Sequence, residues 1–232
     1  MREPLIIGHR GASAVAPENT IAAFEAAIAA GADGIEFDVH LSRDGVPVIV
    51  HDDTLQRTHG LRKRVADMTA DELHEVRVPR LSELFDLVGQ NEMLLCLELK
   101  GSSESLAQKC CRVVSEFSFS ERVIVECFDL RVLQEVKGLR TAALFGRGIY
   151  TDQKLIDRAL EVGASVLAPH HSLVRRSLIE KAKRAGLKVV VWTVDSPAWV
   201  AQARTMGIEA LITNDPAMMI EAYDCLRVEL AG

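Results

Sequence analysis

Residues 34–51 read GIEFDVHLSRDGVPVIVH, and this stretch decides the fold of the chain. Two runs in which side chains alternate between the two faces of a strand flank the pair Asp44-Gly45. An Asp-Gly pair between two such runs is a strong signal for a β-hairpin. We therefore predict that a strand over residues 34–41 turns at this pair and runs back beside itself as a second strand over residues 46–51.

Outside this hairpin, short β-branched runs alternate with amphipathic stretches, which is typical of βα units. The predicted strands cover residues 5–9, 34–41, 46–51, 93–100, 122–128, 141–145, 165–169, 188–194 and 209–213. Nine strands are one more than a closed eight-stranded barrel needs, and the hairpin accounts for the extra one. We predict an α/β fold, a single-domain (β/α)8 TIM barrel over residues 1–232 with a short insertion at 53–80. The alternative, an open doubly wound sheet, is weakened because no G-x-G-x-x-G follows the first strand.

Helices are expected between most of the strands. The clearest covers residues 20–30, with Asn19 as its N-cap and Gly31 at its end. A second covers residues 177–185, and a short one is expected at 70–76 inside the insertion. The inward face of the second helix consists of Leu178, Ile179 and Ala182.

The composition is that of a soluble globular protein, with 27 Lys plus Arg, 33 Asp plus Glu and a formal net charge of -6. This acidic balance argues against a nucleic-acid backbone or an anionic membrane as partner, since both attract clustered basic residues. No run approaches the roughly 18 apolar residues of a membrane span. The 5 cysteines lack paired spacing and are expected to be small buried residues in a reducing compartment, so we expect a cytoplasmic location. The oligomeric state is left open.

Three acids are expected to converge at one end of the barrel. Glu36 and Asp38 share one face of their strand, and Glu98 shares a face with Lys100 on another. Crowded carboxylates repel one another unless a cation compensates them, and an all-oxygen set favours Mg²⁺ or Ca²⁺ over zinc. The alternative is that the acids form structural ion pairs with Lys100 and neighbouring arginines.

Two histidines end predicted strands beside these acids. His9 closes the first strand, and His51 closes the third, where a two-residue hairpin loop would place it opposite Asp38. A pair of imidazoles can divide general-acid and general-base duties near neutral pH. Arg10 and Lys100 could hold a phosphoryl oxygen together with the metal, or they could simply neutralise the acids.

These residues resemble the pattern of the glycerophosphodiester phosphodiesterases, whose barrel is similar to that of phosphatidylinositol-specific phospholipase C. The matching stretches are His9-Arg10-Gly11, Pro17-Glu18-Asn19-Thr20, Glu36-Phe37-Asp38-Val39, Asp44 to Asp52, Arg57-Thr58, Leu97-Glu98-Leu99-Lys100 and Trp192-Thr193-Val194. They span most of the chain in order. The resemblance implies the same barrel and the hydrolysis of a glycerophosphodiester to glycerol 3-phosphate and an alcohol.

The resemblance also implies a role for each site residue. His9 and His51 would act as general acid and base, in an order that the sequence leaves open. The metal ligands would be Glu36, Asp38 and Glu98, and the phosphate would be held by Arg10 and Lys100. Trp192 would line the glycerol or alcohol pocket, with a plug of the barrel as the alternative.

Two alternative functions remain, and the chain departs from the family pattern at several positions. The rivals are a lysophospholipase D-type phosphodiesterase and a non-catalytic barrel that binds a phosphate ester. The insertion is expected to be shorter than is usual in the family. Cys127-Phe128 replaces a common Ser-Phe pair, and Val194-Asp195 a common Val-Asn pair. His170 and His171 are expected to be surface or rim residues.

Overall fold

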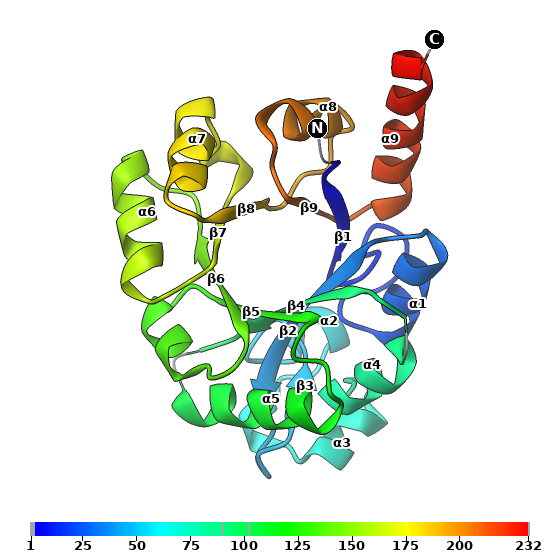
Figure 1. Ribbon diagram of the computed structural model, residues 1–232. Coiled ribbons are helices and arrows are strands. Elements are labelled where there is room, and N and C mark those ends of the chain that lie inside the picture. Colours follow the sequence, from blue (N-terminus) through cyan, green and yellow to red (C-terminus); the bar gives the residue numbers. More distant parts are fainter. Residues whose placement is uncertain (1–2, 90, 102, 232) are drawn as a thin grey trace.

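The computed structural model describes residues 3–89, 91–101 and 103–231. In this part of the chain a nine-stranded sheet curls into a barrel with helices around its outside (Figure 1). The strands are β1 (Leu5–His9), β2 (Gly34–Leu41), β3 (Pro47–Ile49), β4 (Leu94–Leu99), β5 (Val123–Cys127), β6 (Arg140–Phe145), β7 (Val166–Pro169), β8 (Lys188–Val191) and β9 (Ala210–Thr213). Each predicted strand is present, with small shifts at the ends.

The helices fill the connections between strands. The α-helices are α1 (Ile21–Ala29), α2 (Gln56–His59), α3 (Ala70–Glu75), α4 (Leu81–Val88), α5 (Glu104–Glu116), α6 (Asp152–Glu161), α7 (Arg176–Arg184), α8 (Ala198–Met206) and α9 (Pro216–Ala231). Short 3-10 turns are η1 (Val65–Asp67), η2 (Leu130–Glu135) and η3 (His171–Leu173). The expected helix at 177–185 is α7, and its three predicted inward residues are buried.

The sheet closes on itself. β1 pairs in parallel with both β2 and β9, and the ring continues through parallel pairs from β9 to β4 and back to β2. β3 pairs antiparallel with β2 and lies outside this ring. The (β/α)8 barrel with an extra hairpin strand is therefore confirmed, and the open sheet is excluded.

The hairpin register differs from the prediction by one residue. His40 lies opposite Val48, and the carbonyl of Asp38 accepts a hydrogen bond from the N–H of Val50 at 2.9 Å. Val50 therefore takes the place opposite Asp38 that was expected for His51. The expectation that these two residues face each other on the ladder was wrong, and His51 lies beyond the end of β3.

The cause is a loop of three residues, 43–45, in place of two. The N–H of Ser42 donates to the carbonyl of Val46 at 3.0 Å, and Gly45 has φ 76. This is a common three-residue hairpin loop, which ends on a glycine in the left-handed region. The Asp44 carboxylate also accepts from the backbone N–H of Ala70, which ties the loop to the start of α3.

The N-cap of α1 is Thr20, not Asn19 as predicted. The Thr20 hydroxyl accepts from the N–H of Ala23 at 3.2 Å. Asn19 has φ 57 and donates through its side-chain amide to the Asp38 carboxylate at 2.8 Å. Asn19 therefore links the β1–α1 loop to β2 instead of starting the helix.

Strand alternation divides the barrel into two cores. Ile35, Phe37 and Val39 point outward and pack with the helices. The Phe37 ring, for example, lies 6.3 Å from the Phe24 ring of α1, measured between ring centroids. The inner core consists of Ile7, Cys96, Ile124, Ala142, Leu144, Val166, Ala168, Val190, Ala210 and Ile212. This apolar plug fills the barrel below the ionisable side chains, so the functional end is closed from beneath.

The segment 53–80 carries a small core of its own. Leu55, Val65 and Leu73 are buried there against Val48 of β3. The short helix expected at 70–76 is present as α3, while α2 was not anticipated. The hairpin strand thus carries one apolar cluster on its outer side, and this cluster supports the loop in which His51 lies.

The 5 cysteines are free, and their burial follows the prediction for only part of the set. Cys96, Cys110 and Cys127 are buried, Cys111 is half-buried and Cys225 is exposed. Among helices in the described residues, none combines the length and apolar character needed to cross a bilayer.

Gly11 provides a test of how closely the β1–α1 loop packs on α1. Gly11 has φ +84, and a Cβ there would lie 2.6 Å from the backbone C and O of Ala23. Gly31 has φ +79, and a Cβ there would have nothing within 4 Å, so Gly31→Ala isolates the cost of the left-handed backbone. We expect Gly31→Ala to lower the free energy of unfolding by about 1–2 kcal/mol.

Gly11→Ala should cost roughly 1–3 kcal/mol more than this control, because the added methyl group overlaps a helix backbone that cannot move aside cheaply. Urea unfolding of both variants measures the difference. Equal costs for the two substitutions would show that the loop does not press against α1.

Candidate active site

The carboxyl ends of the barrel strands surround a cavity of about 110 Å³. This is the end at which TIM barrels place their chemistry. Its lining consists of His9, Arg10, Glu36, His51, Glu98, Lys100, Glu126, Phe128, Leu144, Trp192 and Ile212. Seven of the residues singled out from the sequence are in this set, and the eighth, Asp38, is fully buried beside them. A larger hollow of about 600 Å³, lined by parts of α1 and the 53–80 segment, lies apart from these groups.

The three predicted acids meet as expected. Glu36, Asp38 and Glu98 are buried, and one oxygen of each lies within 4.8 Å of the others. Asp38 and Glu98 stand side by side in the β2–β4 register. A compact all-oxygen set of this kind fits a hard divalent cation such as Mg²⁺ or Ca²⁺.

The two predicted cations contact the same acids. Lys100 Nζ lies 2.9 Å from Asp38 Oδ1 and 2.5 Å from Glu98 Oε1. Arg10 has φ 56, and this left-handed backbone lets its N–H donate to Glu36 Oε2 at 2.9 Å. The Arg10 guanidinium lies 3.2 Å from Asp38 Oδ2. The ion pairs of the alternative interpretation are therefore present, and whether they suffice depends on the charge balance.

A fourth buried acid, Glu126 on β5, was missed from the sequence. It is 2% exposed, lines the cavity and stands next to Glu98 in the β4–β5 register. Its signal was available, because it is the one acid in the otherwise apolar strand VIVEC. Together with Glu36, Asp38 and Glu98 it makes four carboxylates against the two cations Arg10 and Lys100.

Burial and the neighbouring charges set the pKa values of the four acids. Burial, and then the neighbouring Asp38 carboxylate, raise the pKa of Glu98 to about 7. Burial and the other acids raise the pKa of Glu36 and of Glu126 well above the ordinary value. Asp38 differs, because Lys100 and Arg10 outweigh its burial and lower its pKa. The two cations therefore lower the pKa of only one of the four carboxyl groups, Asp38, so ion pairing with them does not keep the whole cluster ionised.

His9 lies at the end of β1, and its two ring nitrogens face different residues. Nδ1 is 2.7 Å from Asn214 Oδ1, and Nε2 is 3.9 Å from Glu36 Oε2. The same Asn214 oxygen accepts from the Ser13 hydroxyl at 2.8 Å. Burial and the nearby Arg10 charge lower the pKa of His9, which favours the neutral ring.

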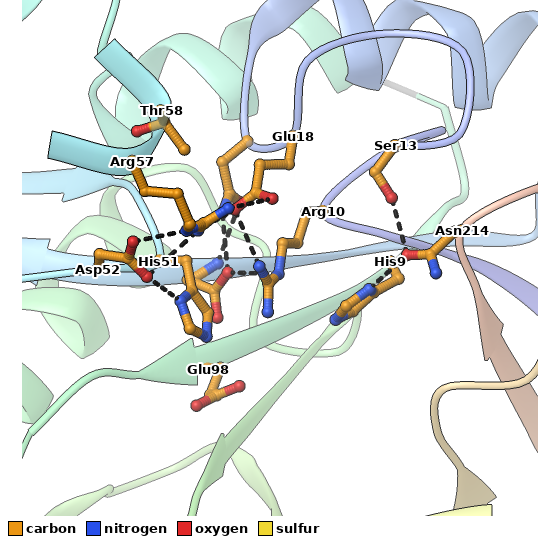
Figure 2. Close-up of polar contacts among 12 residues, drawn as sticks. His9, Arg10, Ser13, Glu18, His51, Asp52, Arg57, Thr58, Glu98 and Asn214 are labelled. Carbon is orange, nitrogen blue, oxygen red and sulfur yellow. Dashed lines mark hydrogen bonds and ion pairs between the residues drawn. The ribbon is translucent and has the colours of Figure 1, made fainter. Parts of the chain in front are cut away.

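His51 has a different partner, a carboxylate. Its Nδ1 lies 2.6 Å from Asp52 Oδ1, and Arg57 donates from Nε to Asp52 Oδ2 at 2.7 Å. Glu18 accepts from Arg57 and also from Arg10 Nη1 at 2.8 Å. Figure 2 shows this network, with His51 and His9 on either side of Arg10. Glu18 and Arg57 belong to stretches that match the family pattern, but the sequence suggested no role for either.

Aromatic and apolar side chains form the opposite wall. Trp192 follows β8 and donates from Nε1 to the carbonyl of Ala168 at 2.8 Å. Phe128 and His170 pack edge-on against its ring, at 5.5 Å and 5.3 Å between centroids. His170 is 7% exposed, so the expectation of a surface or rim residue was wrong for it, and it supports Trp192 from behind.

Comparison with known proteins agrees with this geometry. The model of the glycerophosphoryl diester phosphodiesterase family matches residues 9–218. A glycerophosphodiester phosphodiesterase of Caldanaerobacter subterraneus is 34% identical, over 93% of this chain and 96% of that protein.

Solved structures give the same result. The glycerophosphodiester phosphodiesterase of Thermotoga maritima has a TM-score of 0.84 at 27% identity, covering 95% of this chain and 99% of that one. An Oleispira antarctica phosphodiesterase in complex with its product, sn-glycerol-3-phosphate, has a TM-score of 0.85 at 27% identity, covering 96% and 97%. With its closed barrel and its family match over most of its length, the chain belongs to the glycerophosphoryl diester phosphodiesterase family of enzymes.

Proposed function

We propose that this chain hydrolyses a glycerophosphodiester to sn-glycerol 3-phosphate and an alcohol such as choline, ethanolamine or glycerol. The observation that carries the proposal is that two imidazoles and two cations border one cavity together with the acid cluster. The named relatives and the product bound to the Oleispira protein support it. The cavity of about 110 Å³ is smaller than the roughly 300–1,000 Å³ pockets that enclose drug-sized ligands, so it would hold the phosphate end of the ester rather than the whole molecule.

A divalent cation, Mg²⁺ or Ca²⁺, is proposed at Glu36, Asp38 and Glu98. Support comes from the oxygen donor set and from the presence of four buried carboxyl groups beside only two cations, Arg10 and Lys100. When bound, such a cation polarises a phosphoryl group and favours ionisation of an attacking hydroxyl. The chain's own cations, Arg10 and Lys100, would hold the phosphoryl oxygens as charge builds on them.

The histidines are proposed to divide proton transfer according to their partners. His9 has a neutral amide at Nδ1 and a lowered pKa, so it is the base that takes the proton from the attacking hydroxyl. His51 has the Asp52 carboxylate at Nδ1, and a carboxylate in that position orients the ring for proton transfer. With His9 as the base, His51 takes the remaining role, the acid that protonates the leaving alcohol.

The small-molecule substrate and a cytoplasmic location are proposed together. The free cysteines are in keeping with a reducing compartment.

A lysophospholipid is a second candidate substrate, because the exposed hydrophobic residues Val15, Phe128 and Ile149 lie in loops that follow β1, β5 and β6, on the side of the cavity. Such side chains could contact an acyl chain.

The substrate proposal is tested by assays for glycerol 3-phosphate released from the glycerophosphodiesters and for choline released from lysophosphatidylcholine, whose other product would be lysophosphatidic acid. We expect turnover with glycerophosphocholine, glycerophosphoethanolamine or glycerophosphoglycerol to exceed that with lysophosphatidylcholine. A preference for the lysolipid would favour the second candidate. Binding of these esters without any product would favour the non-catalytic barrel.

Replacement of either histidine should remove a proton-transfer step. We expect His9→Ala and His51→Ala each to lower kcat by at least about a hundredfold, as is typical for loss of a general acid or base. His74→Ala is the control, because His74 is an exposed residue paired with Glu83 outside the cavity. Near-normal kcat in either cavity variant would contradict the paired roles.

The division of roles is tested by the leaving group. In a p-nitrophenyl ester the leaving group, p-nitrophenolate, departs without being protonated. We therefore expect the loss of kcat caused by His51→Ala to be at least about tenfold smaller on this substrate. The deficit of His9→Ala should stay the same. The opposite pattern would exchange the two roles.

Removal of divalent cations should abolish turnover. We expect excess chelator to remove activity and added Mg²⁺ or Ca²⁺ to restore it, because the four buried carboxyl groups exceed the two cations of the chain. Circular dichroism before and after chelation serves as the folding control. Undiminished turnover in excess chelator would eliminate the metal from the mechanism.

A further inference from the structure

We propose that Asp195 is a positioning residue that fixes the tautomer of His9 by orienting the side-chain amide of Asn214. The proposal rests on the proposed catalytic role of His9. Asp195 follows β8, Asn214 follows β9 and His9 ends β1, so the three residues come from neighbouring strands of the ring. Closure of the ring brings them together, since Asn214 lies 205 positions from His9 in the chain.

Asp195 holds Asn214 through two hydrogen bonds. Its Oδ2 accepts from Asn214 Nδ2 at 2.7 Å, and its Oδ1 accepts from the Asn214 backbone N–H at 2.8 Å. The Thr213 hydroxyl donates to the same Oδ1 at 3.1 Å. Bonds to an ionised acceptor are stronger than neutral ones, so the carboxylate is held in place although Asp195 itself is exposed.

The carboxylate decides which end of the amide faces His9. A carboxylate only accepts hydrogen bonds, so the NH₂ group of Asn214 must face Asp195 and the carbonyl oxygen must face the other way. That oxygen contacts His9 Nδ1 at 2.7 Å and accepts from the Ser13 hydroxyl at 2.8 Å. Ser13 thus supports the same orientation from the β1–α1 loop.

The orientation of the amide in turn decides the tautomer of the imidazole. A carbonyl oxygen only accepts, so His9 Nδ1 must carry the proton. A neutral imidazole has one N–H, which leaves the lone pair on Nε2, the nitrogen on the side of Glu36 and the cavity. A reversed amide would put the proton on Nε2, where the ring could not accept one from a hydroxyl in the cavity.

Asp195 is also one of the positions at which this chain departs from the family pattern, where Val-Asn is common. The contacts connect Asp195 to His9, while the cavity lining does not include it. Its effect is therefore expected in kcat more than in KM.

The first test is an exchange of charge between the two positions. Asn214→Asp places two carboxylates within hydrogen-bond distance, and we expect kcat to fall on the order of tenfold or more, as for other losses of a histidine's orienting partner. In the double variant Asp195→Asn with Asn214→Asp, one acid again faces one amide, and the acid at 214 still accepts from His9 Nδ1. We expect kcat to recover to within about threefold of the original, since such paired substitutions compensate when the residues are in contact.

The second test reads the tautomer directly. Nitrogen NMR of the Mg²⁺-loaded protein separates a protonated from an unprotonated ring nitrogen, and His9→Gln identifies the His9 signals by their loss. We expect Nδ1–H in the original protein and in the double variant, and a mixed or Nε2–H population in Asp195→Ala. Asp129→Asn is the control, because Asp129 is an acid in a loop at the same end of the barrel that pairs with Arg131 and lies outside the cavity.

The outcomes are separable from those of the proposed function. An Nε2–H tautomer in the original protein, or an unchanged tautomer and kcat in Asp195→Ala, would overturn the positioning role. A double variant no faster than Asn214→Asp would do the same. Retained turnover in His9→Ala instead contradicts the catalytic role of His9, whatever tautomer the ring adopts.

Discussion

The site depends on an imbalance of buried charge. Four carboxyl groups lie at one end of the barrel interior, and two cations, Arg10 and Lys100, lie among them. Unpaired charges are costly to bury, so such a cluster persists only if protons or a further cation compensate it. Burial, and then the neighbouring carboxylates, raise the pKa values of Glu36, Glu98 and Glu126. A divalent cation would supply the missing charge without protonating the carboxylates.

The cavity has an ionisable side and an apolar side. Strands β1, β2, β4 and β5 carry the histidine and the acids, while the cavity-lining residues from β6 and β9 are Leu144 and Ile212. Phe128 and Trp192 complete the apolar side. A phosphate ester can therefore place its anionic group toward the cations and its carbon atoms against the opposite wall. The apolar layer below prevents water from reaching the acids from beneath.

The two histidines are supported by unlike networks. His51 depends on Asp52, Arg57 and Glu18, which are supplied by the insertion and the β1–α1 loop. His9 depends on Asn214, which follows the neighbouring strand β9 and is held by Asp195, which follows the next strand, β8. Arg10 connects the His51 network to the acid cluster, because it contacts both Glu18 and Asp38. A difference in partner, carboxylate against amide, distinguishes two side chains that are chemically identical.

The sequence by itself predicted the strands, the extra hairpin strand and seven of the eight residues proposed for the site, because alternation and turn signals are local properties of the chain, and the family resemblance added Trp192. Only the tertiary structure decided the rest. The hairpin loop has three residues, and its Asp44 accepts a hydrogen bond from Ala70. Asn19 donates to Asp38 and does not cap the helix. Glu126 joined the acids, and Asn214 and Asp195 reached His9, through closure of the ring. Those contacts join residues far apart in the chain, and the pattern along any one strand does not contain the register that brings them together.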